Sequence, residues 1–285
     1  MSPEQFVDNL ISGVAQGSVY ALVGLGFTII YTVTRIINFA QGEFVMLGGV
    51  FSFLLFSSVG LPLPLALLLA VLAATVVGAV LYLLAIRPAR QASVISLIII
   101  TIGASTFIRG VVGQIWGKDY MPPLPHFSGD NQWLWIIGIT LVVMVALHLF
   151  FSRTMMGKAL KACSINRQAA SLVGIDARSM AFTSFALAAA LGAIGGAVIT
   201  PLTAPHFRMG LTLGLKGFVA AAVGDFRSQV GTVVGGVILG IAEAMVVVLD
   251  WGPFASAYKD VIAMLVLLLV LFFRSSRGAA QEAAS

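Results

Sequence analysis

The chain has 285 residues, of which 59% are hydrophobic and only 9% are charged, and its mean hydropathy is +1.04. A soluble domain carries roughly 25% charged residues, so this sequence cannot cover a globule with polar groups, and a water-soluble protein is excluded. The net charge of +5 lies in short loops between apolar runs, a distribution that orients membrane proteins and argues against a nucleic-acid partner.

A membrane span needs roughly 20 mostly apolar residues, and the sequence contains eight such runs. They cover about 9–31, 43–60, 63–86, 94–115, 132–151, 180–201, 231–249 and 257–273. A ninth segment, about 211–224, is short and contains Lys216, so it is either a short crossing or a re-entrant helix. These runs are too long for barrel strands. We therefore expect an all-α integral membrane protein, a multi-span helical bundle with one transmembrane domain over 1–285.

The charges of the loops predict the orientation. The longest polar loop, about 152–178, holds five basic residues and one acid, so we expect it in the cytoplasm. Counting spans back places the N-terminus, with Glu4 and Asp8, in the periplasm, and its lack of basic residues argues against a cleavable signal peptide. The basic tail, with Arg274 and Arg277, favours a cytoplasmic C-terminus. Termini on opposite sides of the membrane require an odd number of crossings. Nine crossings meet this requirement and eight do not, which favours segment 211–224 as a true crossing.

Glycines four residues apart predict where helices pack closely, because small residues at this spacing let a second backbone approach. The pairs are Gly13 and Gly17, Gly192 and Gly196, Gly231 and Gly235, and Gly236 and Gly240.

Motifs for catalysis and for metals are absent from the sequence. There is no G-x-x-x-x-G-K-[ST] nucleotide loop and no H-E-x-x-H, and Cys163 is the single cysteine. We expect no enzyme activity, no metal site and no cofactor in this chain.

Polar residues at membrane depth are costly and therefore mark functional candidates. Asn38, Gln41 and Glu43 form a polar break between the first two spans, and Glu243 lies inside a later span. We take these four as candidates for a translocation pathway, although the break could also be a plain cytoplasmic turn. Arg109 lies two turns from the outer end of its span, so it either has a role inside the membrane or reaches the interface.

The loop at 152–178 contains a short amphipathic helix, a turn at Gly174 and a return to the membrane. Its small residues and its basic residues suit insertion into a cleft of a soluble protein, although a helix lying on the lipid surface remains an alternative. The candidate docking residues are Gly157, Lys158, Ala159, Lys161, Ala162, Arg167, Ala169, Ala170 and Gly174.

Several ordered blocks of the sequence resemble the permeases of ATP-binding-cassette importers, and closely the branched-chain amino acid permease family of the H type (LivH-like). The blocks are 9–22, 24–28, 37–48, 157–175, 216–222, 235–243 and 258–260. The resemblance covers nearly the whole chain. It implies a second related permease, two cytoplasmic ATPases that bind ATP and magnesium, a periplasmic solute-binding protein, and a location in the bacterial inner membrane. It also implies that 157–175 docks on an ATPase.

Three departures from the family pattern concern the cargo. Gln41 stands where family members usually have histidine, Asp225 and Arg227 replace glycines of a glycine-rich turn, and the C-terminal segment differs. We expect a branched-chain or other hydrophobic amino acid as cargo. A urea or short-chain amide permease is the alternative within the family, and a stand-alone secondary transporter is the alternative from another class.

Overall fold

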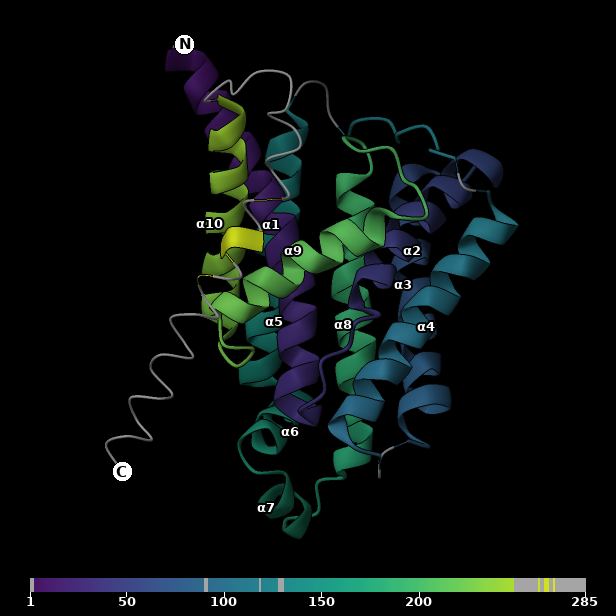
Figure 1. Cartoon of the computed structure of the whole chain (residues 1–285), viewed down its shortest axis with the longest axis vertical. Coiled ribbons are helices and arrows are strands. Elements are labelled where there is room, and N and C mark those ends of the chain that lie inside the picture. Colours follow the sequence, from purple (N-terminus) through teal and green to yellow (C-terminus); the bar gives the residue numbers. More distant parts are fainter. Residues whose placement is uncertain are drawn as a thin grey trace.

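The computed structural model describes residues 3–89, 92–117, 119–127 and 131–248, together with residues 261, 264–266 and 269. Helices make up nearly all of this part of the chain (Figure 1). In chain order they are α1 (Pro3–Thr34), α2 (Gln41–Phe53), α3 (Leu63–Leu81), α4 (Val94–Ile115), α5 (Gln132–Arg153), α6 (Met155–Ile165), α7 (Arg167–Leu172), α8 (Ala177–Ile199), α9 (Met209–Val223) and α10 (Gln229–Val248). Short π-helical turns extend α2 over Leu54–Ser58 and α3 over Tyr82–Ile86.

Seven of the described helices are long and apolar enough to cross a membrane, namely α1, α2 and α3 with their extensions, α4, α5, α8 and α10. They confirm the first seven predicted full spans. The eighth, 257–273, lies outside the described residues apart from residues 261, 264–266 and 269, which are helical.

The short apolar segment forms α9, whose 15 residues rise only about 22 Å at 1.5 Å per residue. Figure 1 shows α9 lying obliquely across the bundle, in front of α1 and α8. The turn after α9 reaches the end of the bundle where α6 lies, because Arg227 lines one cavity together with Lys161. The chain therefore returns toward that end between α8 and α10, as a short crossing requires.

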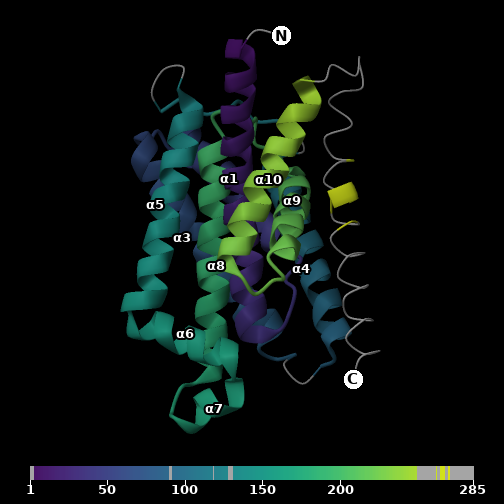
Figure 2. The ribbon, with the colours of Figure 1, turned by 90° about the vertical axis from the view of Figure 1, so that its left-hand side faces the viewer.

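Helix α1 forms the centre of the bundle, and α3, α4 and α5 lie at its edge. α1 packs against α5, α8, α9 and α10 (Figure 2), and Val19, Leu22 and Val23 are fully buried. The outer faces of α4 and α5 expose large apolar side chains such as Phe107 and Val142. An apolar outer face of this kind is stable against lipid and not against water.

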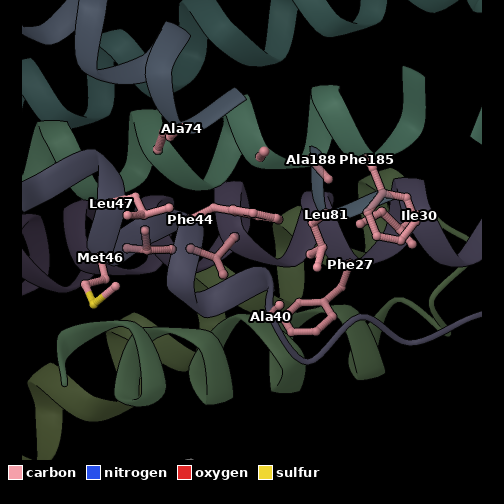
Figure 3. Close-up of a cluster of buried hydrophobic side chains, with 14 of the residues drawn as sticks. Phe27, Ile30, Ala40, Phe44, Met46, Leu47, Ala74, Leu81, Phe185 and Ala188 are labelled. Carbon is pink, nitrogen blue, oxygen red and sulfur yellow. The ribbon is translucent and has the colours of Figure 1, made fainter. Parts of the chain in front are cut away.

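The largest hydrophobic cluster joins α1, α2, α3 and α8. Phe44 and Phe185 are fully buried in it, and Figure 3 shows Phe44 close to Leu47 and Phe185 close to Ala188. Gly78 supplies a small surface of α3 at this point, since an added Cβ would lie 3.4 Å from Cζ of Phe44 and 3.2 Å from the carbonyl oxygen of Phe185.

Glycines bring the backbones of α1 and α10 into direct contact. A Cβ atom added to Gly17 would lie 2.7 Å from the carbonyl oxygen of Gly236, and one added to Gly236 would lie 2.7 Å from the amide nitrogen of Ala21. A Cβ on Gly240 would overlap the backbone of Gly13 and Gly17. No side chain larger than hydrogen fits at these positions.

The other candidate packing glycines lie in similar contacts. In α8, Gly196 faces the carbonyl oxygen of Val45, and a Cβ on Gly192 would lie 3.1 Å from Cβ of Phe44. In α10, a Cβ on Gly235 would lie 2.9 Å from the carbonyl oxygen of Ala220, and one on Gly231 would lie 2.9 Å from Cα of Gly224.

Replacing Gly240 with leucine is expected to destabilise the bundle by about 3 kcal/mol, the upper end of the usual cost of overpacking, since the new side chain meets backbone that cannot move aside. The measurement is the unfolding of the purified chain in mixed micelles of increasing denaturing detergent. The matched control is Gly138→Leu on α5, where an added Cβ meets nothing within 4 Å. Equal losses in the two variants would contradict the close contact between α1 and α10.

Candidate functional site: a polar cluster inside the bundle and a basic loop at its end

The connection between α1 and α2 is a buried, non-helical segment. Arg35 ends α1 with a left-handed backbone (φ 61°), and the chain then runs without helix to Ala40. Asn38 and Ala40 are fully buried, and Oδ1 of Asn38 accepts a hydrogen bond from the amide of Ala40 at 3.1 Å. Irregular backbone at membrane depth is tolerated only where protein or a cavity surrounds it. The segment is therefore not a solvent-exposed turn.

Gln41 and Glu43, in the first turn of α2, are also buried. Nε2 of Gln41 donates to the carbonyl oxygen of Ala188 at 2.9 Å. Among the described residues, Oε1 of Gln41 and Nδ2 of Asn38 have no hydrogen-bond partner. Two amide groups with spare hydrogen-bonding capacity thus lie close together in the sequence, inside the bundle.

Glu43 forms an ion pair with Arg109 of α4. Its Oε1 accepts hydrogen bonds from Oγ of Ser105 at 2.7 Å, from Nε of Arg109 at 3.1 Å, and from Nη2 of Arg109. Its Oε2 is buried without a partner among the described residues. Arg109 therefore turns inward to Glu43 instead of reaching away to the interface.

Sequence reasoning missed Ser105, although α4 carried a signal for it. Thr101, Ser105 and Arg109 are four residues apart and form a polar stripe on an otherwise apolar helix. Oγ1 of Thr101 accepts a hydrogen bond from the amide of Phe39 at 3.3 Å. The stripe therefore supports both the α1–α2 segment and Glu43.

Glu243 forms a second buried ion pair. Its Oε2 accepts from Nζ of Lys216 at 3.0 Å and from the hydroxyl of Tyr20 at 2.8 Å. These residues come from α10, α9 and α1, so the pair ties three helices together. Glu243 does not line the cavity beside Glu43.

That cavity, of about 30 Å³, is large enough for a water molecule but not for an amino acid. It lies between α1, α2 and α9, and Glu43 and Gly210 are among its lining residues together with Phe27, Phe39 and Phe218. In this conformation the space beside Glu43 is small.

A row of aromatic rings continues from this cavity toward the end of α1. The ring of Phe218 lies 5.8 Å from Phe39 and 5.1 Å from Phe226, and Phe226 lies 5.5 Å from Tyr31. The guanidinium of Arg35 lies over the Tyr31 ring at 5.8 Å. The row joins the buried polar cluster to the end of the bundle at α6.

Side-chain caps shape the loop at 152–178. Thr154 caps α6 by accepting from the amide of Gly157 at 2.9 Å, Asn166 caps α7, and Asp176 caps α8. Gly174 adopts a φ of 85°, which a residue with a side chain tolerates poorly. The caps and Gly174 change the direction of the chain twice, between α6 and α7 and between α7 and α8.

Only part of the predicted docking face is exposed. Lys158, Lys161, Arg167, Ala169 and Gly174 are exposed. Gly157 and Ala170 are buried, and Ala159 and Ala162 pack against the bundle. The four alanines therefore do not form one open face, because three of them hold the loop to the spans.

Large apolar side chains that sequence reasoning did not single out are instead exposed at the tip of this loop. Ile165, Leu172 and Val173 are each more than 70% exposed. Cys163 lies underneath with Leu160, and burial raises the pKa of its thiol. Because a raised pKa leaves little thiolate at neutral pH, Cys163 is a packing residue with low reactivity.

The loop is joined directly to the α1–α2 segment. Nη2 of Arg35 donates to the carbonyl oxygen of Ser164 in α6 at 3.2 Å, and Val33 packs with Leu160 and Cys163. A displacement of α6 would therefore act on the start of the segment that leads to Glu43.

Replacing Lys216 with methionine is expected to destabilise the chain by about 3–5 kcal/mol, because it leaves the Glu243 charge buried without its cation. Adding Glu243→Gln should recover at least half of that loss, since a neutral amide can still accept from Tyr20. Thermal unfolding of both variants in detergent tests this. A double variant no more stable than Lys216→Met would show that the pair does not account for the loss.

Comparisons with known proteins support a transport role. Residues 9–271 match the family model described as branched-chain amino acid transport system, permease component. The permease LivH of a high-affinity branched-chain amino acid transport system in Salmonella typhimurium is 30% identical, over 93% of this chain and 92% of its own length. The permease BraD of the corresponding system in Pseudomonas aeruginosa is 31% identical, over 94% of each chain.

A solved structure shares the fold. A chain of PsaBC from Streptococcus pneumoniae, in complex with Fab, superposes with a TM-score of 0.53 at 13% identity, over 94% of this chain and 95% of that one. With a match over most of its length, this chain belongs to the family of permease components of branched-chain amino acid transport systems, and it is a permease subunit of an ATP-binding-cassette importer.

Proposed function

We propose that this chain forms one half of a pathway that carries branched-chain or other hydrophobic amino acids inward by ATPase-driven alternating access. The observation that carries the proposal is the non-helical segment 35–40, which contacts α6 at the exposed Arg35, is buried at Asn38 and Ala40, and leads to the Glu43 cluster. In such a mechanism, movement at the inner end opens and closes the space beside Glu43.

The chemistry near that space suits a hydrophobic amino acid. The free carboxylate oxygen of Glu43 would attract an ammonium group, and the rings of Phe27, Phe39 and Phe218 offer an apolar wall. LivH and BraD belong to systems that transport branched-chain amino acids, which favours this cargo for the present chain.

A second candidate, urea or a short-chain amide, is favoured by one observation. The spare amide groups of Asn38 and Gln41 could hydrogen-bond a small uncharged amide. Uptake of leucine and of urea into the same vesicles separates the two, because an amide permease would accumulate urea and leave leucine outside.

Importers of this family work with ATPases and a solute-binding protein. We propose two ATPases, which bind ATP and magnesium, and a second, related permease across the pathway from this chain. We call the exposed surface at the tip of the loop the knob. It consists of the apolar Ile165, Leu172 and Val173, flanked by the basic Lys158 and Arg167, and it would contact an ATPase. Hydrophobic side chains in such number at a solvated loop favour a protein interface.

We also propose the orientation in the bacterial inner membrane. The basic loop with α6 and α7 would lie in the cytoplasm and the N-terminus in the periplasm, following the distribution of Lys and Arg. The C-terminus, outside the described residues, would be cytoplasmic. The binding protein would then dock at the opposite end from α7.

Replacing Glu43 with glutamine in the complete transporter is expected to lower leucine uptake about tenfold or more, since a charged hydrogen-bonded contact is worth about 1.5–3 kcal/mol. The measurement is ATP-driven uptake into proteoliposomes that contain the permeases, the ATPases and the binding protein. The control is Glu4→Gln, which removes the same charge from an exposed residue. Unchanged uptake in a correctly folded Glu43→Gln transporter would rule out a role for this carboxylate.

Replacing Leu172 with glutamate should abolish copurification of the ATPases, because it places a charge in the centre of the proposed knob. The protein should still insert, since Leu172 is 87% exposed and supports no helix packing. The matched control is Val59→Glu, another exposed apolar residue at the opposite end of the bundle. Full recovery of ATPases with Leu172→Glu would argue against docking at α7.

A further inference from the structure

Two cavities meet on one side of the bundle, where α5, α6 and α10 come together over α1. The first, of about 330 Å³, lies at the α6 end, and the second, of about 230 Å³, extends along the spans. His148, Gln229 and Val230 line both of them, so the two adjoin each other.

The first cavity is basic and rich in hydroxyl groups. Lys161 of α6 and Arg227 of the α9–α10 turn line it, together with Ser152 and Ser164. None of the described residues that line it is acidic. Neither Lys161 nor Arg227 forms an ion pair in the part of the chain that the structure describes. Two unpaired cations beside hydroxyl donors suit an anion with several oxygen atoms.

The second cavity is an apolar groove on the membrane-spanning surface. Met144 and Leu147 of α5 form one side, Val233 of α10 forms the other, and Leu25 of α1 forms the floor. Figure 2 shows this side of the molecule, with α1 visible between α5 and α10. Such a groove fits a hydrocarbon chain.

We propose that these adjoining cavities bind one anionic phospholipid, with its phosphate group near Lys161 and Arg227 and an acyl chain in the groove along Leu25. A free phosphate would leave the groove empty, and a lipid without net charge would bring its own positive group next to the two cations. Basic residues at the membrane surface attract anionic headgroups, and the groove continues from them into the span. The lipid would bridge α6 and the start of α10, and the site is independent of which cargo the importer carries.

Native mass spectrometry of the full chain, purified in mild detergent, tests the proposal with phosphatidylglycerol and phosphatidylcholine of identical acyl chains. Phosphatidylglycerol should bind more tightly by about tenfold, and Arg227→Gln should weaken it about fivefold. Val230→Glu should weaken it similarly by adding a negative charge at the junction. This second variant should fold, because Val230 is 74% exposed and an acid in the first turn of a helix is stabilising.

Arg153→Gln is the matched control, because it removes one exposed positive charge from the last turn of α5 without lining either cavity. It should leave binding of phosphatidylglycerol unchanged. Equal loss in Arg153→Gln and Arg227→Gln would overturn the proposal, as would equal binding of the two lipids. Displacement by excess inorganic phosphate would assign the site to a free anion. Loss of the lipid on assembly with the ATPases would assign the cavity to a protein partner.

Discussion

Direct contact between helix backbones is the constraint on which this structure depends. In a bilayer, burying apolar side chains between helices gains little, because lipid is equally apolar, so close packing and polar contacts hold the bundle together. Gly17 and Gly236 bring α1 against α10, and Gly196 brings α8 against α2. The central position of α1 follows, since it can approach several neighbours at once. Tyr20 of α1 and Glu243 of α10, which share a hydrogen bond, lie on two of the helices that these contacts join.

The close packing makes an irregular segment possible at membrane depth. Residues 35–40 leave the helical pattern, and the backbone amides of Ala40 and Phe39 donate to Asn38 of the segment itself and to Thr101 of α4. The segment joins a loop at the end of the bundle to a carboxylate in its interior. The residue that contacts α6, Arg35, and the buried carboxylate of Glu43 are therefore separated by only a few residues of chain. That short link is the physical basis of the transport mechanism proposed for this permease.

Charge inside the bundle is handled in two different ways. The pair between Glu243 and Lys216 ties α9 and α10 to Tyr20 of α1 and lies away from the cavity beside Glu43. Glu43, by contrast, uses only one oxygen for Arg109 and keeps the other beside a small cavity. A carboxylate that bonds two other helices is suited to holding them together, whereas a carboxylate that lines a cavity is suited to meeting a passing cation. The two acids that looked equivalent in the sequence thus have different surroundings.

The sequence by itself determined the membrane environment, seven of the spans, the short ninth segment, the basic loop and the family, because length, hydropathy and ordered motifs are local properties of the chain. Only the tertiary structure decided which polar groups meet. Glu43 and Arg109 are 66 positions apart, and Tyr20 and Glu243 are 223 positions apart. Residues so far apart do not belong to one sequence motif, so their pairing cannot be read from the sequence. It also decided that Ala170 is buried while Leu172 is exposed, since a six-residue helix shows no clear face until the bundle beneath it is known. Pairing and burial depend on how distant helices pack, and helix packing is set by contacts that no single segment contains.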